Sequence, residues 1–147
     1  MKILIVDDSA FMRKVISDLT QKISFIQTVE IARNGQKAVE AVKDDPEIDL
    51  ILMDIEMPVM DGLTALKEIK KLRNVPVIML SSLSNQDVTI EALDAGAADF
   101  IEKPVNLFSI KQEWITDFKN KILMVKNKSQ QTLNSVDQSL EAISCFK

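Results

Sequence analysis

The chain alternates short apolar runs with helix-like segments, and this alternation constrains its fold more than any other feature. Three of the runs are nearly unbroken Ile, Leu and Val, as expected of strands that are covered on both faces. Five strand–helix repeats in this order require a parallel sheet with right-handed crossovers. We therefore expect an α/β fold, a doubly wound five-stranded parallel sheet with helices on both faces. The runs are residues 3–6, 28–32, 50–53, 77–80 and 99–101.

Between the runs, apolar residues recur at spacings of three and four, which is typical of helices that bury one face. Ser9 is a good helix N-cap, and Phe11, Val15 and Leu19 predict the buried stripe of the helix that follows it. The last stripe predicts a fifth helix over about residues 108–124. The other stripes are Ala38, Val39 and Val42; Leu63, Leu66 and Ile69; Val88, Ala92 and Leu93; and Ile115, Phe118 and Ile122.

Composition excludes several classes of protein. There is no histidine, which removes Ser-His-Asp and Cys-His catalysis and histidine-containing zinc sites. The single cysteine, Cys145, has no partner for an internal disulfide. A net charge of −4 argues against nucleic acid held by bulk electrostatics. Neither a signal peptide nor an apolar run of membrane-spanning length is present. We expect a cytoplasmic protein that binds neither nucleic acid nor membrane.

All glycines and prolines lie within the first 104 residues, so turn signals stop well before the end of the chain. We expect a compact domain over residues 1–122 and a linker or helical tail over residues 123–147. The tail carries a heptad-like stripe, which favours either a linker or a helical seam that makes a homodimer. The stripe consists of Leu133, Val136, Leu140 and Ile143.

Polar side chains stand where four of the five expected strands end. Asp7 and Asp8 follow the first strand, Asp54 the third, Ser81 the fourth, and Lys103 lies just past the fifth. In doubly wound sheets, ligands bind beyond these carboxyl ends, so the five side chains should converge. Three converging carboxylates repel one another unless a cation compensates them. Mg²⁺ prefers oxygen ligands, so we expect the three aspartates to form a Mg²⁺ site.

Asp54 is then both a metal ligand and a nucleophile, because a carboxylate that attacks phosphorus forms an acyl phosphate. Phosphoryl transfer needs mainly positioning and charge neutralisation. Mg²⁺ and Lys103 would supply the charge, and the Ser81 hydroxyl a hydrogen bond to a phosphoryl oxygen. Taken singly, each residue has a simpler explanation; paired aspartates, for example, are common at helix starts. The combination is what indicates phosphoryl chemistry.

These residues resemble the receiver domains of bacterial two-component response regulators, a flavodoxin-like fold. The resemblance covers roughly residues 1–122. It implies that Asp54 accepts phosphate from a phosphohistidine of a histidine kinase. It also implies that Asp7, Asp8 and Asp54 bind Mg²⁺ together with the backbone carbonyl of Glu56. The stretches that carry it are residues 5–9, residues 53–58, Asp61-Gly62, Ser81 and Lys103-Pro104.

The resemblance also implies a conformational switch. Ser81 and Lys103 would contact the phosphoryl group, and Phe100 would turn inward as the serine moves. The surface around the fourth helix, fifth strand and fifth helix would change as a result. The peptide between Lys103 and Pro104 is typically cis in this family. From the residues alone, Phe100 is equally an ordinary core residue, and Glu56 an exposed residue or one that hinders water from reaching the acyl phosphate.

A narrower resemblance is to the receiver part of chemotaxis protein-glutamate methylesterases. It rests on residues 8–13, 80–83, 87–93, 96–97 and 99–101. Those enzymes carry a second domain with a Ser-His-Asp triad, whereas this chain has no histidine and no Gly-x-Ser-x-Gly. We therefore expect the regulatory part of a methylesterase whose catalytic or output domain is absent, a chain that cannot hydrolyse the ester itself.

Other assignments stay open on the sequence. The chain could be a stand-alone receiver or the receiver of a DNA-binding regulator. A Mg²⁺-dependent phosphohydrolase with an aspartyl nucleophile also ends a strand in Asp, but such enzymes place a second Asp two residues on, where this chain has Glu56. A flavodoxin-like cofactor binder is a further alternative, although an acidic pocket repels phosphate when no metal is bound.

Overall fold

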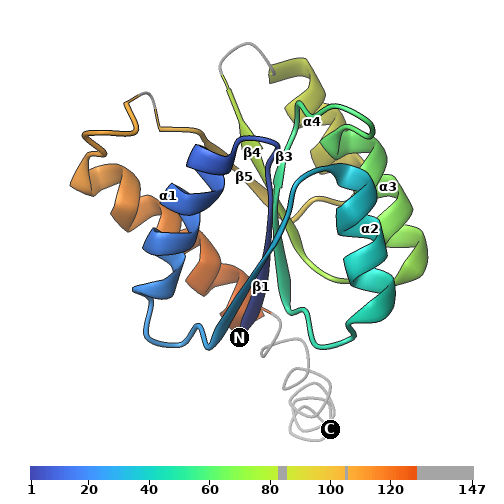
Figure 1. Ribbon diagram of the computed structural model, residues 1–147, viewed down its shortest axis with the longest axis horizontal. Helices are drawn as coiled ribbons and strands as arrows, with labels where there is room; N and C mark the ends of the chain where they lie inside the picture. Colours follow the sequence, from blue (N-terminus) through green and yellow to red (C-terminus); the bar gives the residue numbers. More distant parts are fainter. Residues whose placement is uncertain (83–85, 105, 129–147) are drawn as a thin grey trace, which may run out of the picture.

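The computed structural model describes residues 1–82, 86–104 and 106–128, which form a five-stranded sheet with helices on both sides (Figure 1). The strand order is β2-β1-β3-β4-β5, and every neighbouring pair is parallel. The prediction of a doubly wound parallel sheet is confirmed. The strands are β1 (Lys2–Val6), β2 (Thr28–Ala32), β3 (Leu50–Asp54), β4 (Val77–Ser81) and β5 (Asp99–Glu102).

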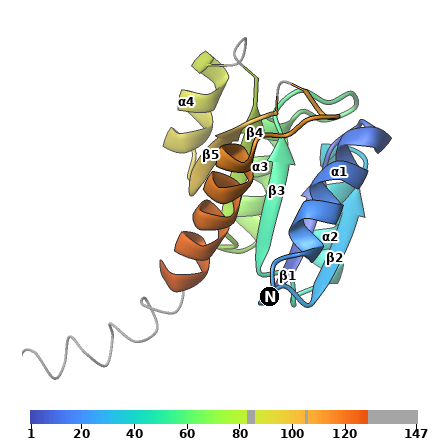
Figure 2. The ribbon, with the colours of Figure 1, turned by 90° about the vertical axis from the view of Figure 1, so that its left-hand side faces the viewer.

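Four labelled helices and a further helix at residues 112–128, here called the C-terminal helix, cover the two faces of the sheet. α2, α3 and α4 lie on one face, and α1 and the C-terminal helix on the other (Figure 1). Figure 2 looks onto the face that carries α1 and the C-terminal helix, and these two helices lie in front of the strands there. The labelled helices are α1 (Ala10–Gln21), α2 (Gly35–Asp44), α3 (Gly62–Leu72) and α4 (Gln86–Asp94).

The core consists of two apolar layers separated by the sheet. Alternate residues of one strand enter opposite layers: Ile3 and Ile5 face α1, while Leu4 and Val6 face α2 and α3. β3 and β4 are buried along their whole length, which explains why their sequences are unbroken apolar runs. This burial holds the carboxyl ends of the strands in fixed positions.

The buried face of α1 differs from the prediction by one residue. Met12, Ile16 and Thr20 are the buried residues, whereas Phe11 is 46% exposed. The Ser9 hydroxyl accepts a hydrogen bond from the Met12 N–H (3.2 Å), which sets the first turn and directs Met12 toward the sheet. The buried Thr20 hydroxyl donates to the Ile16 carbonyl (2.6 Å), so a polar residue on the core face has a partner.

The C-terminal helix begins later than predicted. Asn106 accepts hydrogen bonds from the N–H groups of Phe108 (3.0 Å) and Ser109 (3.2 Å), so this segment forms a turn in place of a helical start. The helix continues to residue 128, and Val125 on it is buried. The expected division of the chain at residue 122 therefore lies inside this helix. The predicted seam at Leu133, Val136, Leu140 and Ile143, and Cys145, lie outside the described residues.

Within the described ranges, no helix is both long and apolar enough to cross a membrane.

Candidate functional site

Three carboxylates meet at the carboxyl edge of the sheet, as predicted. β1 and β3 pair with Val6 opposite Met53, which brings the following residues, Asp7 and Asp54, side by side. Both are almost fully buried, whereas Asp8 is exposed. One carboxylate oxygen from each of the three aspartates lies within 4.8 Å of the others. The edge is therefore acidic and open to solvent through Asp8.

Lys103 reaches this cluster from beyond β5. Its ammonium lies 2.7 Å from Asp54 Oδ1 and 3.7 Å from Asp7 Oδ2. Its backbone N–H donates to the Ser81 carbonyl (2.7 Å), which continues the β4–β5 pairing to the edge of the site. Ser81 itself is buried at the end of β4. The structure thus places all four predicted strand ends at one edge of the sheet.

The electrostatics of the site reflect one ammonium among three carboxylates. Burial raises the pKa of Asp54 to about 6, against the lowering effect of Lys103 and with a further increase from the charge of Asp7. Burial likewise raises the pKa of the Asp7 carboxyl. Burial alone would lower the pKa of Lys103, but its hydrogen bond to Asp54 and the surrounding negative charge raise it. The single ammonium therefore does not balance the three carboxylates, and the cluster is net negative when they are ionised.

One atom of the cluster lacks a hydrogen-bond donor. Asp7 Oδ2 is buried and accepts no hydrogen bond, and the Lys103 ammonium at 3.7 Å is too far to donate one. A buried carboxylate oxygen without a donor is costly unless a cation binds it. The side-chain oxygens that could bind a metal here all belong to carboxylates, the ligand type that Mg²⁺ prefers. The residues therefore fit a magnesium ion.

The first turn of α1 fixes the Asp7 backbone. The Ser9 N–H donates to Asp7 Oδ1 (2.9 Å), and the Arg13 guanidinium donates to the Asp7 carbonyl (2.7 Å). Arg13 is not among the residues predicted from the sequence. Its spacing from Asp7 has no recognisable meaning until α1 is placed against the strand end, so only the fold reveals this contact.

Gly62 allows the start of α3 to pack directly against the backbone of Asp54. A Cβ on Gly62 would stand 2.0 Å from the Asp54 carbonyl oxygen, so only glycine allows α3 to start this close to β3. The Gly62 N–H donates to the Ile55 carbonyl (2.8 Å), and Asp61 caps α3 through the Thr64 N–H (2.8 Å). The start of α3 is therefore fixed against the backbone of Asp54.

The loop between β3 and α3 contains a strained residue. Val59 has a φ of +70°, a left-handed conformation that is costly for a β-branched residue. The Met60 N–H donates to the Pro58 carbonyl (2.8 Å), which closes a three-residue γ-turn around Val59. Glu56, the predicted carbonyl ligand, is exposed at the start of this loop.

The ring of Phe100 on β5 faces outward and is 39% exposed. It therefore belongs to the surface and not to the core in this structure. The peptide between Lys103 and Pro104 is trans, since the described residues contain no cis peptide bond. The expectation of a cis bond is wrong here; trans is the lower-energy form of an X–Pro bond unless its surroundings favour cis.

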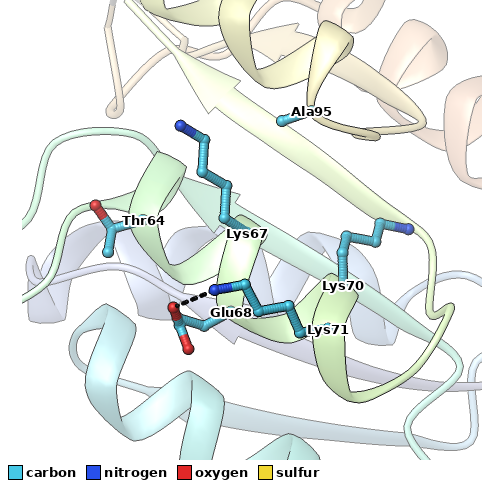
Figure 3. Close-up of a pocket in the computed structure, with 6 residues that line it drawn as sticks. All are labelled: Thr64, Lys67, Glu68, Lys70, Lys71 and Ala95. Carbon is cyan, nitrogen blue, oxygen red and sulfur yellow. Dashed lines mark hydrogen bonds and ion pairs between the residues drawn. The ribbon is translucent and has the colours of Figure 1, made fainter.

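A hollow of about 470 Å³ lies on the α3 side next to the end of α4 and contains none of the predicted site residues. Figure 3 shows Lys67 and Lys70 extending from α3, and Lys71 paired with Glu68 (3.4 Å). Lys70 donates to the Val75 carbonyl (2.8 Å), a contact that ties the end of α3 to the start of β4. Its lining is mainly basic, which does not suit a metal cation.

Comparisons with known proteins agree with this geometry. The family model described as the response regulator receiver domain matches residues 3–114. A protein-glutamate methylesterase/protein-glutamine glutaminase of Methanococcus maripaludis is 47% identical over 111 residues, which are 74% of this chain and 30% of that protein. One of Archaeoglobus fulgidus is 48% identical over 122 residues, 78% of this chain and 34% of that protein. The chain thus spans about a third of the length of these relatives.

Solved structures give the same result. The response regulator domain of Thermotoga maritima CheB is 40% identical, with a TM-score of 0.75 over 86% of this chain and 96% of that one. A chain of the CheX-CheY-BeF3-Mg+2 complex from Borrelia burgdorferi is 31% identical, with a TM-score of 0.72 over 85% of this chain and 88% of that one. The likeness therefore extends over nearly all of the described fold.

Proposed function

Because the chain belongs to the response regulator receiver domain family, we propose that it is a phosphorylation-controlled signalling domain with Asp54 as its phosphoacceptor. Within the family it is similar to the receiver part of chemotaxis methylesterases. One observation carries the proposal: the Lys103 ammonium lies 2.7 Å from Asp54, inside a cluster of three carboxylates. This arrangement supports nucleophilic attack by Asp54 with a fixed positive charge beside it.

In the proposed phosphoryl transfer, Asp54, Lys103 and Ser81 have different roles. An Asp54 carboxylate oxygen attacks the phosphorus of a phosphohistidine on a histidine kinase. The phosphorus–nitrogen bond breaks, and its electron pair returns to the imidazole. The Lys103 ammonium and the Ser81 hydroxyl hold phosphoryl oxygens as the phosphoryl group moves onto Asp54. Because its pKa is about 6, Asp54 is mostly ionised at neutral pH and available as a nucleophile.

Asp7, Asp8 and Asp54 would hold Mg²⁺, with the Glu56 carbonyl as a further ligand. When bound, the ion neutralises charge on the carboxylates and on the phosphoryl oxygens. The buried Asp7 oxygen that lacks a donor supports this assignment. The first turn of α1 holds Asp7 through Ser9 and Arg13, so the ligand is oriented before any ion arrives.

Phosphorylation would act through Ser81 and Phe100. As Ser81 moves toward the phosphoryl group, the Phe100 ring turns inward, and the surface of α4, β5 and the C-terminal helix changes. On this proposal, the outward ring is the arrangement expected of the unphosphorylated state, and the 39% exposure of Phe100 is consistent with it. A partner that prefers one of the two surfaces then responds to phosphorylation.

In a whole methylesterase, that partner would be the catalytic domain, whose access to its substrate the receiver controls. This chain has no histidine, so any ester hydrolysis belongs to that other part. We propose that residues 1–122 belong to the receiver, whose last helix continues to residue 128, and that the remainder of residues 123–147 is a linker or helical tail, with pairing of two tails as the route to a homodimer. No role in binding nucleic acid is proposed for this chain.

The test is the intact mass of the protein after incubation with Mg²⁺ and acetyl phosphate. The expected result is one added phosphoryl group on the wild type, none on Asp54→Ala, and none when EDTA removes the metal. An adduct of equal yield on Asp54→Ala would refute the assignment of the phosphoacceptor. If Mg²⁺ binds but the wild type gains no phosphoryl group within seconds of mixing, the chain is not an active receiver.

A further inference from the structure

Lys121 on the C-terminal helix makes two contacts with the same residue of β5. Its ammonium donates to the Phe100 carbonyl (2.6 Å) and lies 5.0 Å from the centroid of the Phe100 ring. Asp117, one turn earlier on the helix, lies 3.6 Å from the same ammonium. The Lys121 side chain is only 22% exposed, so it is held in this position.

The two contacts depend on Phe100 in different ways. The bond to the carbonyl involves the backbone of β5, which stays in place whichever way the side chain turns. The contact with the ring exists only while the ring faces outward, over the C-terminal helix. A cation over an aromatic face is attracted to it, and partial burial of the lysine strengthens the attraction. Lys121 therefore interacts more favourably with the outward ring than with an inward one.

We propose that Lys121 is a positioning residue that holds the Phe100 ring outward and so opposes the switch to the phosphorylated form. This rests on the proposed function, in which phosphorylation of Asp54 turns the ring inward. A group that contacts only one of two states shifts their equilibrium by its differential interaction with them. Lys121 would thereby set how much of the receiver is switched on before any phosphoryl group arrives.

A matched control exists on the same helix. The Lys126 ammonium lies 4.8 Å from the ring centroid of Phe25, so it makes the same type of contact at a different place. Phe25 lies just before β2 and so at the amino edge of the parallel sheet, whereas Ser81 lies at the carboxyl edge. Lys126→Met removes a cation from a ring without touching Phe100, whereas Lys121→Met removes it from the switch ring.

The experiment is ¹⁹F NMR of the full chain containing 4-fluorophenylalanine, with the Phe100 resonance assigned by its loss in Phe100→Leu. Spectra are recorded without ligand and with Mg²⁺ and beryllofluoride, which mimics the phosphoryl group. In Lys121→Met we expect the inward population without ligand to rise about two- to fivefold. Linkage then requires Lys121→Met to bind beryllofluoride more tightly than the wild type does, by up to the same factor. Lys121→Arg, which keeps the cation, should behave like the wild type, and so should Lys126→Met.

Several outcomes would overturn the proposal. One is an unchanged inward population in a folded Lys121→Met; another is an equal change in Lys126→Met, which would indicate a general effect of helix stability. If beryllofluoride binds to the wild type and the Phe100 resonance does not move, the proposal fails while phosphorylation of Asp54 stands. Absence of both beryllofluoride binding and the acetyl phosphate adduct would instead remove the proposed function itself. Far-UV circular dichroism confirms that each variant is folded.

Discussion

The Lys103 ammonium lies 2.7 Å from Asp54 Oδ1, so the proposed nucleophile and its neighbouring cation are already in contact before any phosphoryl group binds. The contact offsets part of the cost of burying Asp54. It also means that Lys103 must turn from Asp54 to a phosphoryl oxygen as the reaction proceeds. The first prediction follows from this double use.

Replacing Lys103 with Met should slow phosphorylation by acetyl phosphate about 100-fold or more, because a fixed charge beside the transferring group is lost. Initial rates of adduct formation, measured by intact mass, test this. Lys67→Met serves as the control, since Lys67 is exposed on α3 and lines a hollow that contains none of the site residues. A Lys103→Met rate within threefold of the wild type would mean that the ammonium has only a structural role.

The stability of the protein should fall as pH rises from about 4 to 7. The pKa of Asp54 is raised from 3.8 to about 6 by burial, so between these values the folded state binds more protons than the unfolded one. Stability then decreases with pH, because ionising the buried carboxyl disfavours the folded state. Asp54→Asn should remove about 1–3 kcal/mol of this decrease. Urea unfolding of the wild type and Asp54→Asn at several pH values measures this difference. If the free energy of unfolding depends on pH in the same way in both proteins, the raised pKa of Asp54 is contradicted.

Adding Mg²⁺ at neutral pH should raise the free energy of unfolding of the wild type, because the ion binds the folded site and not the unfolded chain. Asp7→Asn should reduce the gain strongly, since it removes the charge of a buried carboxylate whose Oδ2 atom has no hydrogen-bond donor. Thermal unfolding over a Mg²⁺ titration tests both statements. Asp87→Asn is the matched control, a carboxylate on α4 outside the cluster. Equal gains in all three proteins would indicate nonspecific screening.

Gly62→Ala should destabilise the protein by about 1–3 kcal/mol, the usual cost of forcing atoms into a filled space. The new Cβ would stand 2.0 Å from the Asp54 carbonyl oxygen, and backbone must move to relieve this. The same movement displaces Asp54, so phosphorylation should slow as well. Thr64→Ala, an exposed change in the same helix, should cost less than about 0.5 kcal/mol. Chemical denaturation of both variants separates the two cases.

Val59→Gly should stabilise the protein by about 0.5–1 kcal/mol. Val59 has a φ of +70° and its side chain is 83% exposed, so glycine relieves strain without loss of packing. The gain is partial because glycine makes the unfolded chain more flexible. Midpoints of urea unfolding measure the difference. A loss of stability would show that the left-handed turn is not strained.

The strand ends were predictable because a parallel sheet collects them at one edge, so Asp7, Asp54 and Lys103 could be grouped from their places in the sequence. The buried face of α1 could not be predicted in the same way. Two neighbouring stripes are nearly equal in the sequence, and the cap at Ser9 together with packing on the sheet decides between them. That choice depends on tertiary contacts, which local spacing does not encode.

The contacts that hold the site residues in place also could not be predicted from the sequence. The bond from Arg13 to the Asp7 carbonyl and the approach of Gly62 to Asp54 each join a helix to a strand end. Neither has a fixed spacing that would mark it. The pair of Lys121 and Phe100 is separated by a turn and most of a helix, so it becomes visible only once the C-terminal helix lies along β5.

The backbone bond from the Lys103 N–H to the Ser81 carbonyl has an evolutionary consequence. It joins the two positions proposed to hold a phosphoryl group through main-chain atoms, which substitutions at either position leave in place unless proline is introduced. The side chain at residue 81 can therefore change without altering the main-chain distance between the two positions. A lineage that altered residue 81 would change the hydrogen bond offered to the phosphoryl group while the backbone around that group stays as it is.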